Sequence, residues 1–363
     1  MAPVYKVVVS NSSGIVQSFV TSYFDATISR QVNTYDLFTM SMNAKNPNAA
    51  PLVQGAIVSV SRVDKQLGVP EQIEFVGFVR RIDTVYESQT RIAVTCVGMP
   101  ALLADRIVAY KANVANRSTF AAQRAETIAK NLVNFNIGTN ATTANGRVLT
   151  GTVTGFATSA SAGTGNVLTM SCSMRNLLTA LQEVAMLGGG DFDVTYTPPA
   201  SYTFVWYDGQ RGTNRAATVS LSINNGAIAQ TTRTDNRMDD FSAVIVGGPG
   251  TEAARVFYRR PASLPTGTAL RETFINATNQ QNATAAYFNH VGDSALTMQA
   301  RKRVAYDSTV IQNGAFRYGR DYFLGDLVSV NVEGVNITQK VQGVTMSFLD
   351  TGEEEVNVSL ITP

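Results

Sequence analysis

The sequence has very little of the residues that carry metal and redox chemistry. Among its 363 residues there is one histidine, His290, and there are two cysteines, Cys96 and Cys172. A single histidine excludes sites built on two histidines, including the HExxH zinc motif. The two cysteines are far apart and have no CxxC spacing, so we expect free, buried thiols, with a disulfide as the alternative.

Charge and long apolar runs are also scarce. Charged residues make up 15% of the chain and the formal net charge is +2, so no basic excess favours non-specific binding to nucleic acid. No apolar run approaches the roughly 18 residues that a membrane span needs. The first residues do not form a basic segment followed by an apolar one, so we expect no secretory signal. The length predicts two to four domains.

No short motif combines the residues that a catalytic or binding site requires. His290 has no partner in the sequence pattern that would make it a catalytic base. Asp191 and Asp193 share one face of a predicted strand and could hold a metal ion, but aspartate is also common where a strand follows a glycine-rich turn. Gly247–Gly250 lacks the Lys-Ser/Thr pair of a phosphate loop and contains a proline, which has no N–H to donate.

Three further groups have simple structural explanations. Asp208–Gly212 is typical of a turn, because it lacks the spaced carboxylates of a calcium loop. Glu353–Glu355 could supply a glycosidase pair, but three adjacent carboxylates are more typical of a solvated turn. Trp206, the only tryptophan, is expected in a core. We therefore predict that the protein is not an enzyme and has no catalytic, cofactor-binding or metal site.

Three short runs of residues occur twice in the chain, in the same order. The first is Gly55–Val60, which is repeated as Gly325–Val330. Two later pairs and a looser upstream pair accompany it: Phe75–Val79 with Val341–Thr345, Ile92–Cys96 with Val356–Leu360, and Asp36–Met40 with Asp240–Val244. One such match says little, because valine and serine suit any half-buried strand, but the shared order indicates a duplicated β-domain. Two unrelated β-segments of similar composition are the alternative.

The region between the repeats contains helical patterns. Three helices are expected, with Pro100, Ser118 and Ser173 at their starts: Pro100–Asp105, Ser118–Gly138 and Ser173–Gly190. Residues 139–171 fit either a long surface excursion or a hairpin with strands at Arg147–Thr154 and Asn166–Met170. Two strands, Asp191–Tyr196 and Tyr202–Tyr207, follow the third helix, and a further helix is expected within 283–305.

Several stretches resemble one family when they are taken in this order. They are Val97–Arg106, Asn176–Gln182 before Asp191–Val194, Gly209–Arg215 leading into Val219–Ser222, Tyr318–Val330 and Asp350–Glu354. The assembled pattern resembles the baseplate-hub family of tailed bacteriophages, in particular the gp37-like minor tail proteins of siphophages. Tyr318–Val330 is the most specific stretch, and none of them is a catalytic signature. Residues 139–171 depart from the family pattern.

The resemblance implies a fold class and a division into domains. We expect a β-rich α+β multidomain protein, with two tail-tube-like antiparallel β-barrel or sandwich domains and a helix-containing inserted α+β domain. Tube-like β-domain I is expected at residues 1–105 and β-domain II at 225–258 with 306–363. The inserted domain is expected at 106–224 with 259–305.

The resemblance also implies a function and partners. Such hubs are homotrimers whose six β-domains form a ring, which joins a hexameric tail tube or distal tail ring to threefold fibre or needle proteins. DNA passes without specific binding, and a tape-measure protein is a further possible occupant of the lumen. The location implied is the tail tip of the virion, after assembly in the host cytoplasm.

Three rival functions remain open from the sequence. The first is a cell-wall-degrading tail enzyme. The second is a carbohydrate-binding adhesin that uses the aromatic group Tyr196, Tyr202, Trp206 and Tyr207. The third is a spike-complex hub of a contractile injection system.

Overall fold

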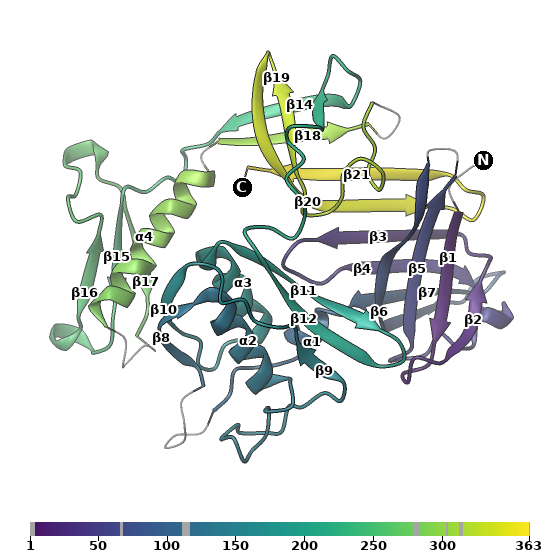
Figure 1. Cartoon of the computed structure of the whole chain (residues 1–363), viewed down its shortest axis with the longest axis horizontal. Coiled ribbons are helices and arrows are strands. Elements are labelled where there is room, and N and C mark those ends of the chain that lie inside the picture. The colour runs from purple at the N-terminus through teal and green to yellow at the C-terminus, as the bar shows by residue number, and fades with distance from the viewer. Residues whose placement is uncertain are drawn as a thin grey trace.

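The computed structural model describes residues 4–65, 68–110, 117–278, 284–302, 304–311 and 315–362. Both ends of the chain contribute to one large β-structure, with a helical unit beside it and a small sheet with one helix further out (Figure 1). The expected β-rich α+β fold class is confirmed.

Seven strands form what we call the N-terminal β-copy, residues 4–98. They are β1 (Val4–Ser10), β2 (Val16–Val20), β3 (Asp25–Gln31), β4 (Leu37–Asn43), β5 (Ile57–Asp64), β6 (Val69–Val85) and β7 (Arg91–Gly98), with a 3-10 turn at Pro47–Ala49. Burial alternates along β4, β5 and β7, as expected for strands with one face in a core. Lys65–Pro70, whose glycine and proline are typical of a hairpin tip, joins β5 to β6, although Gln66 and Leu67 lie outside the described residues.

The C-terminal β-copy comprises residues 220–235 and 304–361. Its strands are β13 (Ser220–Ser222), β14 (Ile228–Asp235), β18 (Val304–Val310), β19 (Leu327–Val332), β20 (Val335–Phe348) and β21 (Glu354–Ile361). β20 pairs with β19 and β21 and, through Gly343–Phe348, also with β3 of the N-terminal β-copy. The two copies therefore share one eleven-stranded sheet, in which the yellow strands of Figure 1 lie beside the purple ones.

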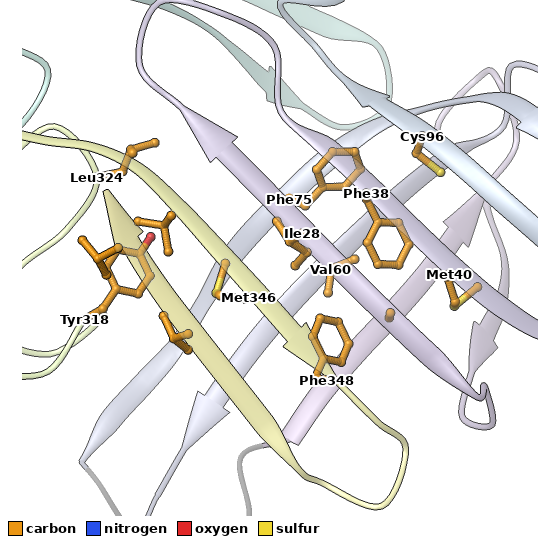
Figure 2. Close-up of a cluster of buried hydrophobic side chains, with 14 of the residues drawn as sticks. Ile28, Phe38, Met40, Val60, Phe75, Cys96, Tyr318, Leu324, Met346 and Phe348 are labelled. Carbon is orange, nitrogen blue, oxygen red and sulfur yellow. The ribbon is translucent and has the colours of Figure 1, made fainter. Parts of the chain in front are cut away.

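One hydrophobic core serves both β-copies. Met346 and Phe348 of β20 lie among Ile28, Phe38 and Val60 of the N-terminal β-copy (Figure 2). All five side chains are buried. The two copies therefore form a single packed unit rather than two separate domains joined by a linker.

The α+β unit, residues 99–208, follows β7. It contains α1 (Ala101–Ala104), β8 (Thr119–Arg124), α2 (Ala125–Asn136), β9 (Phe156–Thr158), β10 (Val167–Ser171), α3 (Leu177–Gly188), β11 (Gly190–Thr197) and β12 (Ser201–Asp208). The sequence spaces apolar residues along one face of α3, and this face is buried: Leu177, Leu178, Leu181 and Val184. Gly189, the middle one of three consecutive glycines, has a left-handed conformation and ends this helix.

Two helix starts in this unit differ from the prediction. Ser118 does not cap a helix: residues 119–124 form β8, because they pair with β10, and α2 begins at Ala125. Pairing with a strand distant in sequence overrides the local pattern here. Ser173 does not cap α3 either. Asn176 is its N-cap, since the Asn176 side chain accepts a hydrogen bond from the Thr179 N–H and donates another to the Ala104 carbonyl.

Residues 139–171 contain one of the two strands expected there. The strand near Asn166–Met170 is present as β10, whereas Arg147–Thr154 forms no strand. The buried guanidinium of Arg147 instead donates to the carbonyls of Leu149 and Ile107, which holds the segment as irregular chain. β9 follows this segment and pairs parallel to β12.

A small-sheet unit, residues 243–302, interrupts the C-terminal β-copy. It contains β15 (Ala243–Gly247), β16 (Phe257–Arg260), β17 (Glu272–Asn276), 3-10 turns at Glu252–Ala254 and Gly267–Ala269, and the expected helix as α4 (Ala285–Lys302). The sequence grouped residues 242–246 with the second β-copy, but β15 pairs with β16 and β17 and lies outside the main sheet. Its upstream match to Asp36–Met40 of β4 is therefore not a structural equivalence. Val244, Val246 and Phe288 of this unit pack into the core of the α+β unit.

Hydrogen bonds at two glycines show that the repeat is structural. The Gly55 N–H donates to the Val79 carbonyl at 2.9 Å, and the Val79 N–H returns to the Ala56 carbonyl at 2.9 Å. The same two bonds occur in the C-terminal β-copy at the same lengths. There the Gly325 N–H donates to the Val341 carbonyl, and the Val341 N–H donates to the Asp326 carbonyl. Gly55 and Gly325 have positive φ angles of 80° and 88°.

The register with the following strand repeats as well. In each copy a bulge follows directly, between Val79 and Arg81 and between Val341 and Gly343. Cys96 pairs with Val79 and Leu360 with Val341, in agreement with the third repeated run. Val79 is thus the counterpart of Val341. The glycine-centred second run is misaligned, because Gly77 corresponds to Gln339 rather than to Gly343.

Candidate functional site: a buried polar junction

Asp191, one of the carboxylates considered for metal binding, lies where the units of the chain meet. It stands at the start of β11 and is 1% exposed. Its carboxylate accepts hydrogen bonds from Lys340 Nζ of β20 at 2.6 and 2.7 Å, Asn33 Nδ2 at 2.8 Å and the Arg211 N–H at 2.7 Å. One carboxylate therefore ties the α+β unit to both β-copies.

Asp193 lies two residues further along β11 and belongs to the same junction. Its carboxylate accepts from Arg211 Nη2 at 2.6 Å. The two acids thus bind cationic side chains of the protein itself, and this arrangement neutralises the charge that a metal ion would need.

Asp326 makes a second link, between the loop after β12 and the C-terminal β-copy. Its buried carboxylate accepts from Arg215 Nε at 2.7 Å, from the Thr213 N–H at 2.6 Å and from the Phe323 N–H at 2.8 Å. Gly212 packs so closely that a Cβ there would lie 2.3 Å from the Asp326 backbone nitrogen. The loop expected as a turn at Asp208–Gly212 is therefore a docking segment.

Glu354 closes a third link, between the last strand of the chain and the first. It accepts from Arg62 Nη2 of β5 at 2.8 Å and from the hydroxyl of Tyr5. The Tyr5 ring stacks on Phe348 with centroids 3.5 Å apart. Burial and the charge of Glu354 raise the pKa of Tyr5. Burial alone would lower the pKa of Arg62, but its hydrogen bond to Glu354 raises it. Glu354 is thus not the solvated turn residue expected of Glu353–Glu355.

A fourth group lies in the seam between the β-copies. Arg30 Nη1 donates to Glu74 Oε2 at 2.7 Å, and the Tyr318 hydroxyl lies 3.3 Å from the same oxygen. Arg30 Nε also reaches Asp36 at 3.4 Å. Burial raises the pKa of Tyr318, so its hydroxyl stays protonated. Tyr318 begins Tyr318–Val330, the most specific stretch of the family resemblance.

The remaining candidates lie elsewhere and have packing partners. Carbonyls of Gly247 and Gly248 accept from the Arg255 side chain, so a cation of the protein occupies the glycine-rich loop. His290 lies half-buried on α4. Trp206 is buried, as expected, over Gly190 of β11.

The cysteine prediction is confirmed: Cys96 and Cys172 are free and buried. Burial raises the pKa of the Cys172 thiol to about 12, so it is not a poised nucleophile. Within the described residues, no group of three or more His, Cys, Asp or Glu could hold a metal ion. The predicted absence of catalytic, cofactor and metal sites stays a prediction.

The aromatic group considered for carbohydrate binding is largely unavailable. Tyr202 and Trp206 are buried, and Tyr196 and Tyr207 are half-buried. Tyr202 stacks against Phe156 with ring centroids 6.3 Å apart. Tyr202 and Trp206 belong to the core of the α+β unit, and Tyr196 packs against it.

Sequence reasoning missed most of the junction residues. Lys340, Asn33 and Arg62 act through partners distant in the chain, and no local motif marks them. The sequence contains one signal for Asp326. In the repeated run Gly325–Val330, Asp326 places a charged residue at the position that Ala56 occupies in the first copy. A carboxylate in a buried run indicates a fixed partner.

Solved structures share this architecture over nearly its whole length. A tail protein from Neisseria meningitidis MC58 matches with a TM-score of 0.57 and 12% identity, covering 98% of this chain and 96% of that one. The 43 kDa tail protein of prophage MuSo2 from Shewanella oneidensis matches with a TM-score of 0.57 and 15% identity, covering 99% and 98%. The Francisella PdpA–VgrG complex contains a chain that matches at 0.52 and 8% identity, covering 99% of this chain and 52% of that one.

The fold is thus that of phage tail proteins, and the family can be stated. A model of the Siphovirus ReqiPepy6 Gp37-like protein family matches residues 7–360, and the chain belongs to this family. Membership and fold together support a structural role in a phage tail, as a component of the virion. No curated protein matches the sequence. Among the described residues, no helix is long and apolar enough to cross a membrane.

Proposed function

We propose that this protein is a structural hub of a phage tail tip, which assembles as a homotrimer with a ring of six β-copies. The observation that carries the proposal is the internal repeat. Each chain holds two copies of one β-unit, joined edge to edge with the same glycine hydrogen bonds and the same bulge. Three such chains present six similar units to a hexameric partner and three identical surfaces to a threefold one.

The buried junction supports this role by fixing the units to one another. Asp191 ties the α+β unit to both β-copies, Asp326 docks the loop after β12 on the C-terminal β-copy, and Glu354 joins the two β-copies to each other. We propose two tube-like β-domains, residues 4–98 and 220–235 with 304–361, and an inserted domain, residues 99–208 with 243–302. The proposed partners are a tail tube or distal tail ring on one side and fibre or needle proteins on the other.

The ring would also be a conduit for DNA, with a tape-measure protein as a possible occupant before ejection. A wall that attracted phosphate would slow passage in a salt-dependent way. Arg80 is ion-paired with Asp105, Arg81 with Asp83, and Arg320 with Asp321. A structure of the assembled ring with unpaired Lys and Arg along its wall would argue against the conduit.

Native mass spectrometry and electron microscopy of the full chain test the proposal. The expected result is a mass of three 38.9 kDa chains and particles with threefold symmetry that look sixfold near the lumen. A stable monomer or dimer at high concentration, with no rings in micrographs, contradicts it.

We further propose that the protein has no enzymatic activity. The junction carboxylates that could act in catalysis are bound to Lys, Arg or backbone N–H groups. Zymography against host cell walls tests this. Clearing that vanishes on substitution of a single Asp or Glu would instead favour a cell-wall-degrading tail enzyme.

A further inference from the structure

The two β-copies use one equivalent strand edge differently. In the C-terminal β-copy, Gly343–Phe348 of β20 pair with β21 on one edge and with Gln31–Ala26 of β3 on the other. The Val32 N–H donates to the Gln342 carbonyl at 3.0 Å. Because antiparallel bonding alternates along a strand, Val344, Met346 and Phe348 also direct their backbone groups toward β3.

The counterpart in the N-terminal β-copy is the second half of β6. The repeated bulge makes Ile82, Thr84 and Tyr86 the counterparts of Val344, Met346 and Phe348. Arg81–Val85 pair with β7 on one edge, and within the described residues nothing pairs with the other edge.

Exposure shows that this edge is open. Phe348 is 2% exposed because β3 and the shared core cover it, whereas its counterpart Tyr86 is 84% exposed. Met346 is fully buried, whereas Thr84 is exposed. An uncovered strand edge is a template for another strand.

The C-terminal β-copy contains a strand that could cover this open edge. In that copy, β14 occupies the position that β3 occupies in the N-terminal β-copy. In the N-terminal β-copy, β3 pairs with β4, which lies next to β7. In the C-terminal β-copy, β14 pairs with β18, which lies beside β21 (Figure 1). Among the described residues, the outer edge of β14 is unpaired, and nearly all of its side chains are exposed.

We infer that β14 of one chain pairs antiparallel with residues 82–86 of β6 in a second copy of this chain. The contact would repeat, between chains, the β3–β20 contact that each chain already makes within itself. It rests on the proposed ring, and it names the surfaces that close it. The two open edges differ, so the contact is head-to-tail, and a closed ring of such contacts leaves neither edge exposed.

The substitution Thr84→Pro tests this inference, because proline removes the one N–H that the outer edge offers at its centre. Proline is tolerated on an edge whose N–H faces solvent, so the isolated chain should still fold. We expect association between chains to weaken by at least about 100-fold, since the proline ring also obstructs the incoming strand. Thr84→Ala keeps the N–H and is the matched control, for which association should stay within a few-fold of the parent chain. Native mass spectrometry across a concentration series measures both.

Hydrogen exchange of the unsubstituted chain gives an independent reading. The amides of Ile82 and Thr84 should exchange fast in the dissociated chain and become protected in the assembly, together with amides of β14. If a ring forms while these amides still exchange fast, or if Thr84→Pro assembles like the parent, the inference is overturned and the proposed ring survives. If the parent chain forms no assembly, both are overturned.

Discussion

Removal of the Asp191 carboxylate is the sharpest test of the buried junction. Asp191→Ala deletes every hydrogen bond that the carboxylate makes with Lys340, Asn33 and the Arg211 N–H. It leaves the Lys340 ammonium, whose side chain is 11% exposed, without its counter-charge. Loss of one partner of a buried ion pair costs about 3–5 kcal/mol. We expect the free energy of unfolding to fall by that amount.

Urea unfolding followed by fluorescence is the suitable assay. Trp206, the only tryptophan, pairs with Phe192 directly beside Asp191, so its emission reports on the same part of the α+β unit. Lys340→Met and the double variant complete a cycle. The double variant should lose less than the two single losses together, by about 1–3 kcal/mol, because neither charge is then left alone.

An exposed ion pair provides the control. Lys6 and Glu71 lie 2.8 Å apart, but their side chains are 51% and 49% exposed. Glu71→Ala should leave unfolding unchanged, because water already solvates both charges. A loss under about 1 kcal/mol for Asp191→Ala, or strict additivity in the cycle, would refute the view that this carboxylate holds the units together.

Three further predictions concern packing, pH and backbone conformation. Leu181→Ala should lower the free energy of unfolding by about 2–5 kcal/mol in urea titration, because Leu181 is fully buried; a loss under about 0.5 kcal/mol would mean an exposed helix face. Burial alone would raise the pKa of Glu126, but hydrogen bonds from Lys130 and two backbone N–H groups lower it to about 2. The stability from Glu126 is therefore present above its unfolded pKa of 4.5 and lost as pH falls toward 2, and Glu126→Gln should flatten this part of a melting-temperature profile. Gly55→Ala should lower the free energy of unfolding by about 1–2 kcal/mol because of its positive φ alone, since a Cβ there meets nothing within 4 Å. Gly325→Ala should lower it by more, because a Cβ there also meets backbone atoms. Equal losses for the two variants would contradict the steric contribution at Gly325.

The sequence was sufficient for features set by local pattern. The alternation of Val58 and Val60 with serines predicts a half-buried strand, and leucines at helical spacing predict the buried face of α3. The order of the repeated runs predicts a duplication, which the matched bonds of Gly55 and Gly325 display. For the strand and the helix face, the residues that decide the structure are near neighbours in the chain.

Features set by distant partners were not predictable in the same way. Residues near Ser118 look helical, and only their pairing with β10 makes them a strand. Asp191 looks like a metal ligand or a strand start until Lys340 is placed beside it. The alignment of Gly77 with Gly343 followed residue identity, whereas hydrogen bonding fixes the true register at Val79 and Val341. Side-chain partners of this kind depend on the completed fold.

The seam between the β-copies also sets the time at which the chain can finish folding. Arg30 of β3 pairs with Val344 of β20, so the ribosome makes the two sides of the seam at widely separated times. At about 5–20 residues per second, the ribosome needs on the order of tens of seconds to deliver the second side. Until then the edge of β3 has no partner, and a nascent chain that stops short of β20 cannot seal the sheet. Only a chain translated through β20 can therefore carry the sealed sheet.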